Sequence, residues 1–453
     1  MVDPSTTLRH LRGFLDRTTL LVLTTRLWSG LSGPVTVIVL SRTMPPEVQG
    51  YYYTFANLMG LQTFVELGLF QVLLNMGSHE WARLSLDGRG EVVGAPDARS
   101  RLASLGRFAF GWFGGAAVLF VVMAGVIGWR LFASSADAGV AWKGPWMALL
   151  LLTALQGWAM PFHTLLEACG QVEPLQKVRF AQAILSSLVF WLALVAGWGL
   201  WATIASGAVI LLRDVYLLGG RFRTFRRLFL SNLPGERISW RREILPWQWK
   251  LAVLGPSTYL SFGMFTPLLF HFRGAVEAGR LGMSMQLVNL VLTLAGSWFV
   301  TTLPTLGLLA ARGEQGTMER TWLRMTLAST CFAVLAGIGG TGLIYLLPSI
   351  WPVLAERMVG VGTAAIFFAA TATYQLSACL VYFGRAFKRE IAFGVSAVQG
   401  FLILAAAWPL AQAFGVTGLA LAYLGVCALF ILPLNAYFAW RFRMRLPRPD
   451  GAT

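Results

Sequence analysis

The chain alternates between long apolar runs and short polar gaps. Each run is about as long as the roughly 20 residues that an α-helix needs to cross a hydrocarbon layer about 30 Å thick. The pattern predicts twelve transmembrane helices, near 20–41, 51–76, 107–132, 145–168, 178–198, 199–219, 247–270, 280–309, 323–347, 360–384, 391–412 and 415–440. Twelve spans use most of the chain, so no separate soluble domain is expected.

The composition supports a membrane-embedded protein. Hydrophobic residues make up 56% of the 453 residues and charged residues only 12%, about half of the roughly 25% that is usual in soluble domains. A soluble protein of this length could not cover its surface with so few charges. We therefore expect an all-α integral membrane protein, with its helices arranged around a central cavity.

The basic residues are sorted between alternate gaps. Most of the 36 Lys and Arg residues fall in the termini and in every second loop. The exceptions in or beside the other loops are Arg42, Arg130, Lys143, Arg273, Arg280 and Arg357. Only Arg26 and Arg213 lie inside apolar segments. Because basic loops stay in the cytoplasm, the net charge of +16 indicates membrane orientation, and we expect no nucleic-acid partner.

Both termini are predicted to be cytoplasmic, because an even number of spans returns the chain to the side where it began. The basic residues near the two ends agree: Arg9, Arg12 and Arg17 at one end, and Arg441, Arg443, Arg445 and Arg448 at the other. Residues 1–19 are polar and basic, and the apolar run after them is too long for a signal peptide. We therefore expect a multi-pass protein without a cleaved signal.

The most basic gap divides the spans six and six. We expect an N-terminal six-helix bundle over 1–219, a basic cytoplasmic linker over 220–246 and a C-terminal six-helix bundle over 247–453. With six spans each, the two halves would be parallel repeats. In the linker, Phe222, Phe225 and Phe229 lie along one side of a basic helix. This helix would lie on anionic lipid, or its charge is ordinary positive-inside charge.

Arg26 lies about seven residues into the first predicted span. An ionised group at membrane depth costs at least a few kcal/mol, so it should face a cavity or a partner. One interpretation is a cation that lines a central cavity and receives an anionic substrate. The other is an arginine whose long side chain reaches back to the inner membrane surface.

Glu66 lies near the middle of the second span, with Gln62 one turn earlier on the same face. It is either a proton or sodium site or the ionic partner of Arg26. We expect Arg213 and Asp214 to form a local pair at the cytoplasmic surface, and His163 to be a packed, hydrogen-bonded histidine. No dedicated cofactor is expected, although sodium, protons or the membrane potential could drive the protein.

The eighth span carries a polar stripe. Gln286, Asn289, Thr293, Ser297 and Thr301 advance by three or four residues, so they share one helical face. Such a stripe needs water, a ligand or a neighbouring helix beside it. Arg273 and Arg280 precede the stripe near the predicted outer surface, and their planar guanidinium groups suit phosphate. We expect this set, with Arg26 and Glu66, to line a substrate cavity.

Several enzyme classes are disfavoured. The chain contains no G-x-x-x-x-G-K-[ST] phosphate loop and no H-E-x-x-H zinc motif. Its four cysteines have no paired spacing, so they predict neither a disulfide framework nor a metal site. The predicted outer loops are too short to house a catalytic centre. A membrane enzyme such as a polysaccharide polymerase or ligase would generally need a substantial outer loop.

Two segments carry a family resemblance. PEVQGYYYTFANLMGLQTFVELGL resembles the first repeat of bacterial polysaccharide flippases of the multidrug/oligosaccharidyl-lipid/polysaccharide exporter superfamily, and WQWKLAVLGPSTYLSFGMFTPLLFHFRGAVEAGRLGMSMQLVNL is similar to the start of the second. The resemblance implies transport of undecaprenyl-pyrophosphate-linked oligosaccharide to the outer leaflet of a bacterial inner membrane. It also implies that cationic side chains line the cavity between the two six-helix bundles, and Arg26 is the residue that fits this role best here. Polysaccharide polymerase and glycosyltransferases are candidate partners, besides substrate and membrane lipid. The alternative within the same fold is a sodium- or proton-coupled drug exporter, for which Glu66 would be the carboxylate.

Overall fold

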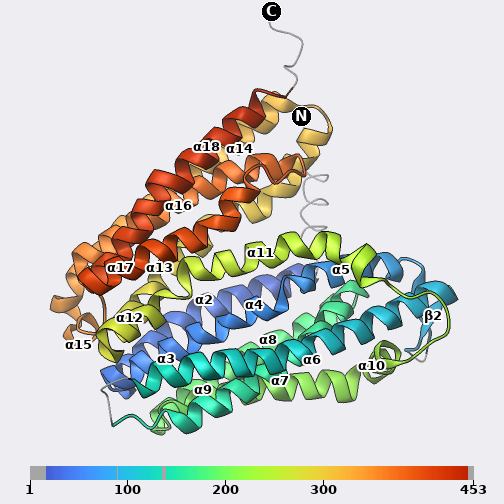
Figure 1. Ribbon diagram of the computed structural model, residues 1–453, viewed down its shortest axis with the longest axis horizontal. Helices are drawn as coiled ribbons and strands as arrows, with labels where there is room; N and C mark the ends of the chain where they lie inside the picture. Colours follow the sequence, from blue (N-terminus) through green and yellow to red (C-terminus); the bar gives the residue numbers. More distant parts are fainter. Residues whose placement is uncertain (1–16, 89, 135–138, 447–453) are drawn as a thin grey trace, which may run out of the picture. The chain divides into compact units, whose positions relative to one another are not determined.

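The structure is a computed structural model that describes residues 17–88, 90–134 and 139–446 (Figure 1). Within these residues the protein is all-α except for one small antiparallel hairpin of β1 (Leu84–Leu86) and β2 (Val92–Gly94). The expected all-α membrane fold is therefore confirmed. Arg9, Arg12 and Arg448, on which the expected position of the termini partly depends, lie outside the described residues.

The chain divides into two compact units. Unit 1 contains the described residues up to Met44, Met59–Ala133 and Gly139–Gly255, whereas unit 2 contains Pro45–Leu58 and Pro256 onward. The first helix of the second span thus groups with unit 2. The expected boundaries at 219 and 247 stay a prediction.

Unit 1 is built from long helices of the first half of the chain. Its elements are α2 (Arg17–Thr43), η1 (Gly60–Gln62), α4 (Thr63–Glu66), α5 (Leu69–Trp81), the hairpin, α6 (Pro96–Ala133), α7 (Lys143–Ala168), α8 (Val172–Val195), α9 (Trp201–Val215), η2 (Tyr216–Arg221), α10 (Arg223–Leu230), η3 (Trp240–Ile244) and most of α11 (Leu245–Phe262). Within this unit α2 packs on α8, and α7 packs on α5, α6 and α9.

Unit 2 holds the remaining helices. They are α3 (Pro46–Met59), the end of α11, α12 (Phe265–Arg273), α13 (Ala275–Ala311), α14 (Gln315–Ile350), α15 (Pro352–Ala355), α16 (Val361–Ala386), α17 (Phe393–Val426), η4 (Cys427–Ile431) and α18 (Leu432–Arg443). The helix α16 packs against α13, α14 and α17. It is therefore the central helix of this unit.

The described helices account for the predicted spans. Eight are long and apolar enough to cross a membrane, or nine when Pro46–Glu66 and Leu69–Trp81 count as one broken span. One of the eight runs over Phe393–Arg443 and contains a non-helical residue, Gly415, at a kink. Dividing it there gives the predicted eleventh and twelfth spans. The first and seventh spans correspond to α2 and to α11 with α12.

The phenylalanine face of the linker helix α10 packs on protein. Its phenylalanines Phe225 and Phe229 are 2% and 0% exposed, and Phe229 lies 5.9 Å from the ring of Phe162 in α7. Of the two interpretations of this helix, the one that places its phenylalanine face on anionic lipid is therefore wrong, and the other, ordinary positive-inside charge, stays a prediction. The three phenylalanines share one face, as their spacing predicts, and this face is covered by the hydrophobic core of unit 1.

The rest of the linker is held by an ion-pair network around Arg101 of α6. Arg101 contacts Glu80 Oε1 at 2.8 Å and Glu243 Oε2 at 2.6 Å. Burial raises the pKa of the Glu243 carboxyl. Hydrogen bonds from the Ser239 amide and from Arg101 lower this pKa by more than burial raises it, so the pKa lies below its ordinary value. The carboxylate therefore stays ionised at neutral pH and ties the linker to α5 and α6.

Candidate functional site

Arg26 lies on a polar strip of α2. Trp28 on the opposite side of this helix donates a hydrogen bond to the Ala183 carbonyl of α8. Two residues correspond to about half a helical turn, so Arg26 points away from α8 and is exposed on unit 1. Helical spacing places Ser29 and Gly30 on its own strip. The guanidinium therefore stands on an open, small-residue surface of the unit.

The exposed leucines of α2 form a separate strip. Leu27 and Leu31 are 65% and 68% exposed, and their spacing of four places them one above the other. The strip of Arg26 is thus distinct from the leucine strip, as expected for a helix with one face toward lipid and another toward water. No described residue forms an ion pair with Arg26, and the expected alternative of an Arg26–Glu66 pair is absent from unit 1.

Glu66 stands at a break in the second span. It is the last residue of α4, and the next two residues, Leu67 and Gly68, adopt left-handed backbone conformations with φ of 51° and 67°. The helix resumes at Leu69. In membrane proteins a broken helix places polar groups at depth where they line a cavity. The sequence signal that could have located this break is the Glu-Leu-Gly triplet itself.

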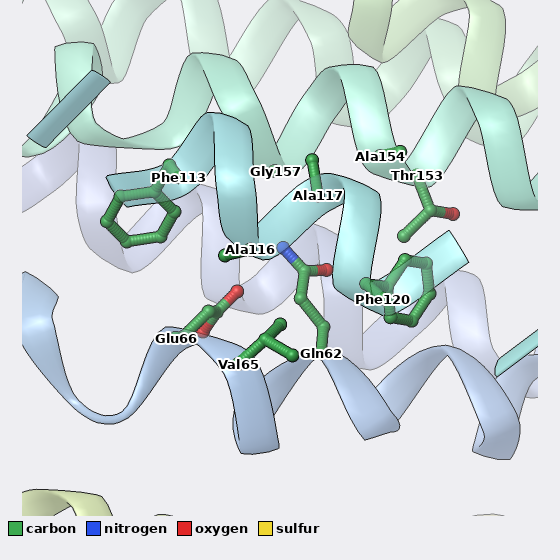
Figure 2. A pocket seen from close by; sticks show the side chains of 10 residues that line it. All are labelled: Gln62, Val65, Glu66, Phe113, Ala116, Ala117, Phe120, Thr153, Ala154 and Gly157. Carbon is green, nitrogen blue, oxygen red and sulfur yellow. The ribbon is translucent and has the colours of Figure 1, made fainter. Parts of the chain in front are cut away.

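The carboxylate of Glu66 lines a small pocket between α4, α6 and α7. Figure 2 shows the side chains of Glu66 and Gln62 pointing the same way, toward Ala116 of α6. Thr153 of α7 also lines this pocket, and the other walls are apolar. Its volume is about 10 Å³, which is room for roughly one water molecule. The carboxylate can therefore exchange a proton through a water, whereas three oxygen-bearing side chains are few for a metal ion.

Substitution of Gly68 is expected to destabilise this break. A Cβ at position 68 would lie 2.4 Å from Leu251 Cβ, and the left-handed backbone costs a residue other than glycine roughly 1–2 kcal/mol. Gly68→Ala should lower the unfolding temperature of the purified protein, measured by differential scanning fluorimetry. Gly30→Ala, where a Cβ meets no atom within 4 Å, is the matched control. Equal stability of the two variants would contradict this account of the break.

The polar stripe of the eighth span lies on α13 and faces outward from unit 2. Gln286, Asn289, Thr293 and Thr301 are exposed, and Ser297 is half-buried. Ser297 and Thr301 donate hydrogen bonds to carbonyls of their own helix. The hydroxyls of Ser297 and Thr301 are therefore satisfied within α13, and both alternatives for the stripe, a neighbouring helix and a water- or ligand-facing surface, stay predictions.

Arg273 and Arg280 lie together, but at an end of unit 2 and not on the stripe. Both line a pocket of about 440 Å³ with Glu277 and the kink at Gly415. Arg280 precedes Gln286 by six residues on α13, a rise of roughly 9 Å. Unit 2 therefore presents two polar surfaces, the stripe and the arginine pocket.

Asp214, Arg213 and His163 form a charged cluster inside unit 1. Asp214 of α9 is 1% exposed, and its Oδ1 lies 2.9 Å from His163 Nε2 of α7 and 2.7 Å from Arg213 Nη2. Arg213 Nη1 also donates to Gln182 of α8. The expected pair of Arg213 and Asp214 is therefore present, and His163 is buried as expected, but the expected position at the surface is wrong. The carboxylate is inside the bundle, because the packing of α7 and α8 on α9 covers a residue near the end of the predicted span.

Comparison with known proteins identifies the fold. No protein-family model matches the sequence, and no curated protein matches it either. Among solved structures, the chain is similar to a lipid II flippase, MurJ, in an inward closed conformation, with a TM-score of 0.61 and 12% identity over 95% of this chain and 88% of that one. It is also similar to an inward-facing multidrug resistance MATE family transporter of the MOP superfamily, with a TM-score of 0.55 and 12% identity over 95% of this chain and 96% of that one.

At these identities the likeness concerns the fold. The protein has the MATE- and MurJ-like architecture of twelve transmembrane helices, as the spacing of apolar runs predicted. The similarity covers nearly the whole chain. The finer assignment to the polysaccharide flippases stays a prediction.

Proposed function

We propose that this protein is a flippase that moves an undecaprenyl-pyrophosphate-linked oligosaccharide from the inner to the outer leaflet of a bacterial cytoplasmic membrane by alternating access. The observation that carries the proposal is the exposed Arg26 on a polar strip of α2. A guanidinium facing hydrocarbon is costly, so a water-filled cavity that admits an anionic substrate accounts for its position. Its planar fork matches the oxygens of a diphosphate.

The stripe on α13 of unit 2 is a second proposed substrate-binding surface. Gln286 and Asn289 carry amides that both donate and accept hydrogen bonds, and Thr293 carries a hydroxyl. Such groups suit the hydroxyls of an oligosaccharide. In this proposal the diphosphate meets Arg26, the sugars meet the stripe, and the polyprenyl chain stays in the bilayer. The substrate crosses without chemical change, so the protein is a transporter and not an enzyme.

A second candidate function is export of a small molecule driven by protons or sodium. Glu66 favours it, because a carboxylate at a helix break in a water-sized pocket is suited to binding a coupling proton. The fold does not decide between the two functions, since a fold can host several. The solved structures with this fold include both a flippase and a multidrug transporter.

Deletion of the gene tests the proposal. We expect the undecaprenyl-linked unit to accumulate on the cytoplasmic side and surface glycan to be lost, with both restored by a plasmid copy. Extracted lipid-linked intermediates and surface glycan are the two measurements. Unchanged surface glycan together with increased drug sensitivity would overturn the flippase proposal in favour of the exporter. The proposed polymerase and glycosyltransferase partners would be sought by crosslinking in the complemented strain.

A further inference from the structure

Unit 2 contains a polar pocket among its transmembrane helices. The pocket has a volume of about 250 Å³ and lies between α13, α16, α17 and the segment formed by η4 and α18. The other helices all contact α16, the central helix of the unit (Figure 1). No residue of the polar stripe on α13 lines this pocket. It is therefore a separate polar feature of unit 2.

The polar residues of the pocket are buried although they belong to apolar runs of the sequence. Four lining residues are at most 7% exposed: Gln375 and Ser377 of α16, Gln399 of α17 and Asn435 of α18. Burial of an amide or a hydroxyl costs free energy unless its polar atoms are hydrogen-bonded. Four such residues around one pocket therefore call for a local reason.

The protein satisfies these groups only in part. Asn435 Nδ2 donates a hydrogen bond to Ser377 Oγ at 2.7 Å, whereas the buried Asn435 Oδ1 accepts no hydrogen bond from the described residues. Gln375 Nε2 donates to Ser329 Oγ at 2.7 Å. This bond holds the amide in place and leaves its carbonyl oxygen as an acceptor. Two amide oxygens can therefore accept hydrogen bonds from a ligand.

Hydroxyl groups and aromatic rings complete the walls. Ser396, Tyr374 and Tyr382 line the pocket, and their hydroxyls can both donate and accept hydrogen bonds. The ring of Tyr382 is held by stacking on Phe299, with the ring centroids 4.7 Å apart. A tyrosine combines an apolar ring with a polar tip. A sugar has the same combination, because its hydroxyls donate and accept while the C–H faces of its ring are apolar.

The charge of the pocket favours a neutral ligand. Arg385 is the only charged residue among the lining residues, and its Nε lies 3.0 Å from Glu390 Oε1. A cationic ligand would meet no carboxylate in the pocket, and an anionic ligand would meet a guanidinium that already has a partner. Since buried charges need partners, a neutral ligand rich in hydroxyls fits this wall best.

The pocket lies toward the predicted cytoplasmic end of its helices. Arg385 is close to the end of α16, and Ser396 is one turn into α17. The gap between these helices contains Lys388 and Arg389, and basic gaps stay in the cytoplasm. This is the side from which the proposed substrate is taken up.

We propose that this pocket binds one neutral sugar residue of the transported oligosaccharide. The identity of the oligosaccharide rests on the proposed function. The volume of the pocket equals that of roughly eight water molecules at about 30 Å³ each, which is the size of one sugar ring. Asn435 and Gln375 accept hydrogen bonds from the sugar hydroxyls, and the tyrosine rings contact its apolar faces. The pocket thus selects the sugar that the protein carries.

Binding of free monosaccharides to the full-length protein in nanodiscs tests the site. The probes are the neutral sugars glucose, galactose, mannose, rhamnose and N-acetylglucosamine, and the measurement is saturation-transfer difference NMR. We expect at least one of them to bind. Cationic glucosamine should give no signal, because no carboxylate lines the pocket.

A pair of glycine variants assigns the signal to the pocket. Gly296 of α13 lines the pocket and Gly339 of α14 does not, and a Cβ at either position meets no atom within 4 Å. Gly296→Leu fills part of the pocket and should weaken sugar binding at least about tenfold. Leucine is a better helix former than glycine, so the helix is kept. Gly339→Leu should bind sugar as the parent does.

Asn435→Leu removes the amide whose oxygen has no partner. The variant should bind the same sugar roughly three- to tenfold more weakly, because a hydrogen bond to the ligand is lost. Saturating sugar should raise the unfolding temperature of the parent and of Gly339→Leu, since a ligand stabilises the folded state that binds it. The rise should be absent in Gly296→Leu and reduced in Asn435→Leu. Each variant without sugar is its own reference, so a change in intrinsic stability does not affect the result.

Several results would overturn the proposal. They are no binding of any of these sugars, binding that Gly296→Leu leaves unchanged, and an equal loss of binding in Gly339→Leu. Stabilisation by sodium ions without sugar binding, lost in Gly296→Leu, would make the occupant a cation and would also overturn it. Sugar binding with the expected variant pattern, together with unchanged surface glycan after gene deletion, would keep the sugar pocket and contradict the flippase. Loss of surface glycan without sugar binding would do the reverse.

Discussion

An Arg26→Ala variant is expected to lose at least about 90% of its transport of lipid-linked oligosaccharide while inserting normally into the membrane. Removal of a guanidinium that hydrogen-bonds a charged group costs about 1.5–3 kcal/mol, and about 1.4 kcal/mol corresponds to a tenfold effect. Arg26→Lys should keep part of the activity, because it retains the charge but not the planar fork. The measurement is the rate at which reconstituted protein moves fluorescent lipid-linked oligosaccharide across a vesicle membrane.

The control for this experiment is another exposed arginine of unit 1. Arg223 of α10 is exposed on the linker helix, and its replacement by alanine should leave transport at the parent rate. Full transport by Arg26→Ala at normal expression would contradict the proposed contact between Arg26 and the substrate. It would favour the other interpretation, in which the long side chain reaches back to the membrane surface. The polar strip shared with Ser29 and Gly30 would then need another explanation.

Replacing Asp214 with alanine is expected to destabilise unit 1 strongly. The carboxylate is 2% exposed and the Arg213 side chain 12% exposed, so the substitution leaves a buried guanidinium without its counter-ion. Breaking a buried ion pair in this way costs about 3–5 kcal/mol. The expected result is a clear fall in the unfolding temperature of the purified protein, followed by its tryptophan fluorescence.

A double variant separates the ion pair from simple loss of packing. Arg213→Met/Asp214→Leu replaces both charges with apolar groups of similar volume, and a buried pair so replaced is often neutral or more stable. We therefore expect the double variant to be more stable than Asp214→Ala alone. If it is as unstable as Asp214→Ala, then the shape of the carboxylate beside His163 matters more than its charge.

The membrane architecture could be predicted because it depends on one-dimensional quantities. Span length is set by the thickness of the hydrocarbon layer, so twelve apolar runs predicted the twelve transmembrane helices of the MATE- and MurJ-like architecture. The helical period likewise predicted that Gln286, Asn289 and Thr293 share a face. The phenylalanine face of α10 was also found from its period. What covers that face could not be read from the period, and it proved to be protein.

The candidate site could be predicted only in part. Arg26 stands out in sequence because a cation within an apolar run is costly. Asp214 did not stand out, because its burial depends on α7 and α8, which are distant in sequence.

By itself the sequence determined that this protein is an all-α membrane protein with twelve spans, and which polar residues fall inside its apolar runs or share a helical face. Those properties follow from hydropathy and from the helical period, which act between near neighbours in the chain. Only the tertiary structure decided that Glu66 lines a water-sized pocket at a helix break, that Asp214 is buried with His163, and that Arg273 and Arg280 meet in one pocket. Burial and convergence depend on which distant helices pack together, and hydropathy alone does not specify that packing.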